Sequence, residues 1–253
     1  MNEIKLGIVI QARTGSNRLP NKILLDFFEG KSIIELLIEK IKINFCDLPI
    51  ILATSVARND RKLVKIADKY KIFSFQGNEK NVLLRFIDIV NRYDFTHIIR
   101  ICSDNPFMNM EGIRNLIKNL DDKSIDYLSY CNSRGVPVIR THLGLFAEVV
   151  SVKALNIANN IHEDIKYQEH VTNYIYENPT RFSIKLLPCL DEVFDRQDIR
   201  LTLDDNDDFK NLSFLYKQTE YRQTENLKKL IDYIDQNIEI KNTMLKNINR
   251  YTK

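Results

Sequence analysis

The sequence predicts an α/β protein in which a mostly parallel, Rossmann-like sheet is sandwiched between helices. Two observations lead to this prediction. Short apolar runs alternate with segments of helical periodicity over the first half of the chain, which is typical of βαβ units and of a sheet covered on both faces. The 253 residues, of which 44% are hydrophobic and 28% charged, also suit a single globular domain over residues 1–253.

The elements of the first half can be placed in order from their patterns. The first strand covers Leu6–Gln11, almost at the start of the chain. The first helix covers residues 32–42, because its apolar residues recur on one face and Ser32 and Glu35 form a capping box. Further strands are expected at residues 50–54, 72–76, 97–101 and 127–130, and further helices at residues 60–70 (capped by Asp60), 82–93 and 110–120.

The second half is less regular, and its turn residues predict an inserted segment. Gly135 and Pro137 indicate a hairpin or flap over about residues 132–144. Expected after it are strands at residues 145–151, 182–187 and 199–202, helices at residues 153–160 and 167–176, a helix capped by Asp207 or Asp208, and C-terminal helices over about residues 207–253, one of them amphipathic from Leu227 to Ile238.

Charge and composition argue against several classes of partner. The net charge of +3 is spread along the chain, and no block of five like charges indicates a nucleic-acid arm or a polybasic membrane patch. No apolar run approaches the roughly 18 residues of a membrane-spanning helix. The four cysteines are scattered singly. We therefore expect a cytoplasmic protein with reduced thiols that binds neither nucleic acid nor membrane.

Several familiar catalytic and binding motifs are absent. The chain has no GxSxG elbow of a serine hydrolase, no GxGxxG of a dinucleotide oxidoreductase and no Walker A loop. His142, His162 and His170 lack the spacing of zinc ligands.

The loop after the first strand has the composition of a phosphate site. Ligands of open parallel sheets bind at the carboxyl ends of the strands, where this loop lies. Its backbone N–H groups and cations could hold a polyphosphate, although a solvated basic turn has the same composition. The residues concerned are Arg13, Thr14, Gly15, Ser16, Arg18 and Lys22.

Two carboxylates could complete the site. Asp104 directly follows the strand at residues 97–101, and a carboxylate opposite a phosphate loop is a usual way to hold Mg²⁺. The same Asp-Asn-Pro sequence could instead form a turn in which Asp104 caps the next helix. A carboxylate of the acidic stretch at residues 203–208 could be a second metal ligand, although an acidic run of this kind is more often the solvated start of a helix.

At these residues the chain resembles a known family. Residues 10–25 (IQARTGSNRLPNKILL, with Ile10 first) resemble the opening signature of the CMP-sugar synthetases, the acylneuraminate and 3-deoxy-manno-octulosonate cytidylyltransferases. Within them the chain is most similar to the spore-coat polysaccharide biosynthesis protein F group. The resemblance covers roughly residues 5–220 and continues through residues 53–54, 60, 77, 82–86, 100–107, 144–151, 169–172 and 200–204.

The resemblance implies a GT-A-like nucleotidyltransferase that joins CTP to an acceptor oxygen and releases pyrophosphate. Arg13, Lys22 and Asp104 would be the catalytic residues, and Asp104 and Asp204 would bind Mg²⁺. Asn81 stands where the spore-coat group commonly has Asp, which removes a charge near the nucleotide. The nucleotide-binding residues implied are Ala12, Arg13, Ser16, Arg18, Lys22, Asn81, Arg85 and Ser103.

The acceptor and the partner are less defined. The acceptor implied is an acid sugar or a related surface-polysaccharide precursor, with Arg140, His142, Glu148 and His170 as its candidate contacts. Family relatives are commonly dimers, so a homodimer is expected. Apolar residues of the flap could pack on a second subunit, or the flap could fold over the chain's own site.

Two other functions share parts of this pattern. A GT-A-type glycosyltransferase would use a nucleotide-sugar donor and release a nucleoside diphosphate, but the dense cations of the first loop suit a triphosphate better. A binding module without catalysis would tolerate changes at Asp104 and Asp204.

Overall fold

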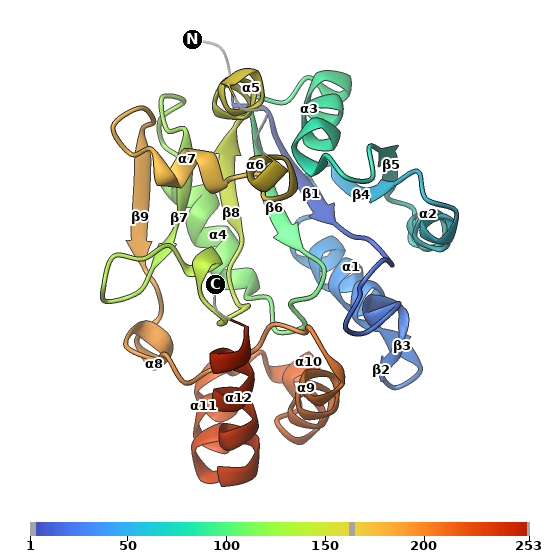
Figure 1. Ribbon diagram of the computed structural model, residues 1–253, viewed down its shortest axis with the longest axis vertical. Helices are drawn as coiled ribbons and strands as arrows, with labels where there is room; N and C mark the ends of the chain where they lie inside the picture. Colours follow the sequence, from blue (N-terminus) through green and yellow to red (C-terminus); the bar gives the residue numbers. More distant parts are fainter. Residues whose placement is uncertain (1–3, 162–164, 252–253) are drawn as a thin grey trace.

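The computed structural model describes residues 4–161 and 165–251 and contains the predicted sheet (Figure 1). Every strand of this seven-stranded sheet runs parallel to the others except β8, which is antiparallel to both of its neighbours. The mostly parallel α/β architecture is therefore confirmed. In sheet order the strands are β5 (Phe73–Gly77), β4 (Ile50–Ser55), β1 (Leu6–Gln11), β6 (His97–Cys102), β8 (Glu148–Ser151), β7 (Tyr127–Cys131) and β9 (Ile184–Pro188).

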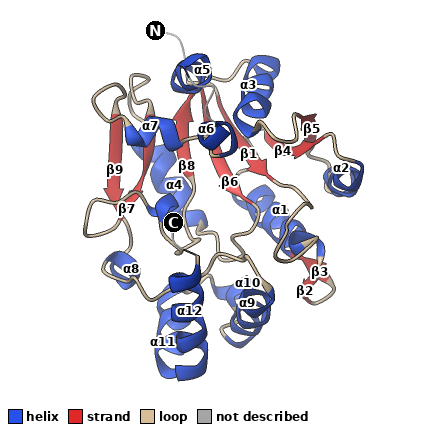
Figure 2. Cartoon of the chain, viewed as in Figure 1, coloured by secondary structure: helices blue, strands red, loops and turns tan. Residues whose placement is uncertain are grey.

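Helices cover both faces of the sheet because the central strands are apolar on both sides (Figure 2). In β1, Ile8 and Ile10 face one core and Val9 faces the other, as the twofold alternation of a strand requires. The first core is packed by α1 (Ile33–Asn44), α2 (Arg61–Lys69), α4 (Met110–Asn119), α9 (Asn206–Gln218), α11 (Leu227–Gln236) and α12 (Ile238–Arg250). The second is packed by α3 (Val82–Tyr93), α5 (Val152–Ile161) and α7 (Asn173–Glu177).

Short elements join these layers. A two-stranded antiparallel ribbon, β2 (Asp26–Phe28) with β3 (Lys31–Ser32), leads into α1. Ser32 then caps α1 through the predicted capping box with Glu35. The remaining short helices are α6 (Ile165–Glu169), α8 (Asp191–Phe194) and α10 (Tyr221–Thr224). Within the described ranges, no helix has the length and apolar character needed to cross a membrane.

The strand predicted at residues 199–202 is wrong. These residues are extended but belong to no strand of the sheet. Single backbone hydrogen bonds tie the segment to two loops instead: Leu201 N–H donates to the carbonyl of His142 at 2.9 Å, and Leu203 N–H donates to the carbonyl of Asp104 at 3.0 Å. The apolar pattern therefore reflects burial beside the sheet and not pairing within it.

Two segments that were each predicted as one helix are divided into two helices in the structure. The segment at residues 167–176 divides into α6 and α7 because buried Val171 and Thr172 form a turn, where the Thr172 hydroxyl donates to Glu148 at 2.9 Å. The amphipathic C-terminal segment divides at Asn237, which ends α11 and whose side chain caps α12.

Two predicted caps are also corrected. The side chain of Asp205, not of Asp207 or Asp208, caps α9, with Asp208 as the second member of a capping box. Asp60 precedes α2 but makes no side-chain cap there, since its carboxylate is used elsewhere.

The flap at residues 132–144 packs against its own chain. Val138, in a 3-10 turn (Val138–Arg140), is buried in the first core, and residues 138–141 line the cavity described below. Its far end is fixed by Gly144, whose φ is +61°. A Cβ at Gly144 would lie 2.8 Å from the carbonyl carbon of Leu201, so only glycine fits there.

We expect Gly144→Ala to lower the free energy of unfolding by about 3 kcal/mol, because it adds a backbone clash to the strain of a positive φ. Gly135→Ala is the matched control: its φ is +71°, but a Cβ there would meet nothing within 4 Å. We expect the control to lose only about 1 kcal/mol in denaturant unfolding. Equal losses for the two variants would contradict the close packing of the flap on residues 201–202.

Candidate active site

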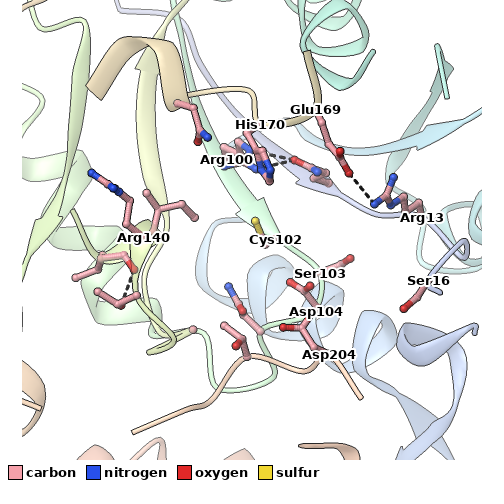
Figure 3. Close-up of a pocket in the computed structure, with 18 of the residues that line it drawn as sticks. Arg13, Ser16, Arg100, Cys102, Ser103, Asp104, Arg140, Glu169, His170 and Asp204 are labelled. Atoms are coloured by element: carbon pink, nitrogen blue, oxygen red, sulfur yellow. Dashed lines mark hydrogen bonds and ion pairs between the residues drawn. The ribbon is translucent and has the colours of Figure 1, made fainter. Parts of the chain in front are cut away.

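A cavity of about 910 Å³ opens at the carboxyl ends of β1 and β6 (Figure 3). From β1 the chain winds outward through β4 and β5 and then returns to β6 on the other side of β1, so the cavity lies where the strand order reverses. Its walls come from the first loop, the end of β6, the flap, the α6–α7 segment and residues 202–204.

The first loop is held in place by Asp60. The buried Asp60 carboxylate accepts hydrogen bonds from the N–H and hydroxyl of Thr14, at 2.8 and 2.6 Å, and from the N–H and hydroxyl of Ser55. Burial alone would raise the pKa of Asp60, but these hydrogen bonds outweigh it and hold the pKa below its usual value. Asp60 thus connects the loop to the end of β4.

We expect Asp60→Ala to lower the free energy of unfolding by about 3 kcal/mol, because two buried hydroxyls and two N–H groups lose their acceptor. Denaturant unfolding measures the loss, with Asp68→Ala on the exposed side of α2 as the control. Since the Asp60 pKa is lowered in the folded state, its contribution is present above its unfolded pKa of about 3.9 and is lost as the pH falls through the lowered folded pKa. A loss no larger than that of the control would contradict this role.

Lys22 joins the two predicted carboxylates. Its Nζ lies 2.9 Å from Asp104 Oδ2 and 3.2 Å from Asp204 Oδ1, and it also donates to the carbonyl of Leu203. Burial alone would lower the pKa of Lys22, but the two carboxylates outweigh it and raise the pKa. The Lys22 ammonium therefore stays charged at the centre of this cluster.

Asp204 is surrounded by cations. Arg18 and Arg200 each donate to it at 2.8 Å, in addition to Lys22. Burial would raise the pKa of Asp204, but the three cations lower it to about 2. Arg200 has a fully buried side chain and also forms a two-pronged pair with Asp208.

The donor set fits a magnesium ion. Asp104 and Asp204 reach one ammonium, so their carboxylates are close enough to share a cation, and carboxylate oxygens are ligands that Mg²⁺ accepts. The described residues contain no group of three or more His, Cys, Asp or Glu side chains that could hold a metal. Two carboxylates suit Mg²⁺, which commonly binds one or two of them together with substrate phosphates.

Arg100 forms the wall of the cavity on β6. Its guanidinium is held by Gln11 Oε1, at 3.0 and 2.8 Å, and by Glu148, the residue directly opposite it on β8. Tyr127 and Thr172 donate to the same Glu148 carboxylate. Burial would lower the pKa of Arg100, but neighbouring groups, Glu148 among them, outweigh it and raise the pKa.

The structure brings most of the predicted residues to the cavity wall and leaves five behind it. Glu148 is buried under Arg100, and the His142 ring contacts Arg200. Arg85 is buried and donates to the carbonyls of Asn78 and Glu79, while Asn81 caps α3. Ala12 is buried in the first core. The predicted residues that line the cavity are Arg13, Ser16, Arg18, Lys22, Ser103, Asp104, Arg140, His170 and Asp204.

Charged residues of α6 and α7 that were not predicted as site residues also line the cavity, and one of them contacts the first loop. Glu169 pairs with Arg13 at 3.1 Å (Figure 3), and Lys166 pairs with Glu177 at 2.9 Å. They follow no strand, so the strand-end rule could not find them. In total the wall carries Arg13, Arg18, Lys22, Arg100, Arg140 and Lys166 against Asp104, Glu169, Glu177 and Asp204, an excess of cations that suits a polyanion.

Comparison with known proteins decides the family. A model of the family described as Cytidylyltransferase matches residues 7–248. The chain belongs to this cytidylyltransferase family. The family confirms the predicted enzyme class, a nucleotidyltransferase, over the glycosyltransferase and the binding module.

Two relatives cover almost the whole chain. The uncharacterized protein MJ1063 of Methanocaldococcus jannaschii is 39% identical over 236 residues, 92% of each protein. The spore coat polysaccharide biosynthesis protein SpsF of Bacillus subtilis is 30% identical over 243 residues, 94% of this chain and 96% of the relative.

Solved structures share the fold. A cytidylyltransferase from Leptospira borgpetersenii has a TM-score of 0.81 at 26% identity, covering 94% of this chain and 97% of the other. CMP:2-keto-3-deoxy-manno-octonic acid synthetase, solved in complex with CTP, has a TM-score of 0.63 at 16% identity, covering 85% and 99%. This second likeness concerns the fold alone.

Proposed function

We propose that this cytidylyltransferase transfers the cytidylyl group of CTP to a hydroxyl of a sugar-like precursor of a surface polysaccharide, with Mg²⁺ held by Asp104 and Asp204. The observation that carries the proposal is the convergence of both carboxylates on Lys22, next to the cationic first loop. The name of the Bacillus subtilis relative supports the polysaccharide acceptor.

The first loop is suited to the triphosphate. Arg13, Arg18 and Lys22 supply cations, and the Ser16 hydroxyl lies on the same wall. A Cβ at Gly15 would meet nothing within 4 Å, so the backbone of the loop can be approached closely from the cavity. Because Asp60 fixes Thr14, these groups are in place before the nucleotide arrives, which lowers the cost of ordering them on binding.

The reaction needs no protein nucleophile. An acceptor hydroxyl oxygen forms a bond to the α-phosphorus, the bond from phosphorus to the bridging oxygen breaks, and pyrophosphate leaves with the electron pair while the hydroxyl proton passes to solvent. Bound Mg²⁺ supplies positive charge at the reacting phosphate. Lys22 and Arg18 offset the charge that builds on the leaving pyrophosphate, and Arg13 holds it in line. Arg140 and His170 line the same cavity, and we assign them to the acceptor.

A screen of acceptors tests the proposal. Pyrophosphate release is followed with CTP and Mg²⁺ in the presence of eight- and nine-carbon 2-keto acid sugars, neutral sugars and sugar phosphates. We expect release with at least one of these acceptors, together with a product that contains CMP. Release of a nucleoside diphosphate from a nucleotide sugar, with no pyrophosphate from CTP, would contradict the proposal.

A further inference from the structure

The last turn of α12 carries a tyrosine that reaches the site. The face of α12 formed by Ile240, Met244 and Asn247 is buried, and Tyr251 continues this face at helical spacing. Residue 251 lies beyond the range that matches the family model, which ends at residue 248. Figure 1 shows the chain ending here, after α12.

Hydrogen bonds fix this turn on the acidic stretch. The Asn247 amide donates to Asp208 Oδ1 at 2.9 Å and to Asp205 Oδ1 at 3.3 Å. The Tyr251 hydroxyl donates to Asp205 Oδ2 at 3.0 Å. The ring of Tyr251 is therefore held at a defined place beside Asp204.

The ring contacts both arginines that bind Asp204. The guanidinium carbon of Arg18 lies 4.4 Å from the ring centroid, and that of Arg200 lies 5.2 Å from it. Arg200 is fully buried and is also paired with Asp208, so it needs no further support. The Arg18 side chain is 45% exposed, and Tyr251 and Asp204 are the partners that the structure gives its guanidinium among the described residues.

We propose that Tyr251 is a positioning residue that holds the Arg18 guanidinium at the mouth of the cavity for the triphosphate. An aromatic ring attracts a guanidinium through its face without neutralising its charge, so the N–H donors at the edge of Arg18 remain available for phosphate oxygens. Asp204 cannot do this alone, because its carboxylate occupies one nitrogen of the guanidinium edge and is itself the proposed ligand of Mg²⁺. The inference rests on the proposed function, in which Arg18 binds the triphosphate.

Calorimetric titration with CTP, without acceptor, tests the inference. We expect Tyr251→Leu to weaken CTP binding by about three- to fivefold, and Tyr251→Phe, which keeps the ring, to bind CTP within about twofold of the wild type. Tyr233→Leu on α11 is the matched control and should leave CTP affinity unchanged. In turnover, the Leu variant should raise the KM for CTP more than it lowers kcat.

The same substitution made in an Arg18→Ala protein distinguishes the positioning of Arg18 from a general destabilisation of α12. In an Arg18→Ala protein, Tyr251→Leu should have no further effect on CTP affinity, because the ring then has no phosphate-binding guanidinium to hold. An equal effect in both backgrounds, or a loss in Tyr251→Phe as large as in Tyr251→Leu, would overturn the inference. If the wild type binds CTP and Tyr251→Leu binds it equally well, only this inference fails. If the wild type binds no triphosphate, this inference and the proposed function both fail. If the wild type binds CTP but transfers it to no acceptor, and the loss in Tyr251→Leu disappears in the Arg18→Ala background, the positioning role is supported and the proposed function fails.

Discussion

We expect Asp104→Asn to lower the rate of cytidylyl transfer by at least about a hundredfold while the protein stays folded. The substitution keeps the shape of the side chain but removes the charge that the carboxylate offers to Mg²⁺ and to Lys22, and such losses of electrostatic stabilisation cost about two to three orders of magnitude. The rate is measured by pyrophosphate release at saturating CTP and Mg²⁺.

Asp88→Asn is the control for this variant. Asp88 is exposed on α3 and is not among the residues that line the cavity, so its loss of charge should leave the rate unchanged. Retention of near-wild-type turnover by Asp104→Asn would show that Asp104 is not a metal ligand.

We expect Lys22→Met to lower kcat/KM for CTP by about a hundredfold and to destabilise the fold. The ammonium that lies between Asp104 and Asp204 is lost, and the triphosphate loses a cation that acts on its leaving group. Because Asp204 keeps Arg18 and Arg200, we expect a loss of only about 2 kcal/mol in the free energy of unfolding, less than for an isolated buried pair.

The response of the thermal midpoint to Mg²⁺ is a second test of the Lys22→Met variant. Without the Lys22 ammonium the two carboxylates repel each other, so Mg²⁺ should raise the thermal midpoint of Lys22→Met more than that of the wild type. Lys210→Met, at an exposed position of α9, controls for the loss of a lysine. A kcat/KM within threefold of the wild type, roughly the scatter of a neutral surface change, would contradict the role of Lys22.

The sequence predicted correctly those strands and helices whose buried residues recur with a single regular spacing. The strand Leu6–Gln11 and the helix Val82–Tyr93 have the predicted bounds because each buries one clear apolar pattern. Residues 199–202 have the same apolar pattern as a strand, but whether such a segment pairs depends on contacts far away in the chain. Asn237 ends one helix and begins another within a continuous amphipathic pattern, which periodicity alone does not reveal.

The site follows the same division. Lys22, Asp104 and Asp204 could be predicted because each lies where a strand-end rule or a family motif places it. Arg100 and Glu148 lie opposite each other because β6 and β8 pair in antiparallel register. The alternation of strands and helices in the sequence predicted parallel neighbours and therefore did not indicate this pair. The charges of α6 and α7 reach the cavity through packing against α3 and α5, which local patterns do not indicate.

The central claim is that this cavity binds CTP together with Mg²⁺. The thermal midpoint is measured with CTP, UTP, GTP and ATP, each with and without Mg²⁺, and no acceptor is needed. Ligand linkage gives about 2.7 kcal/mol of stabilisation at a hundredfold excess over the dissociation constant. We predict a large shift with CTP and Mg²⁺ and small shifts with the other three triphosphates. A shift with none of the triphosphates, but a clear one with a nucleoside diphosphate or a nucleotide sugar, would contradict the claim.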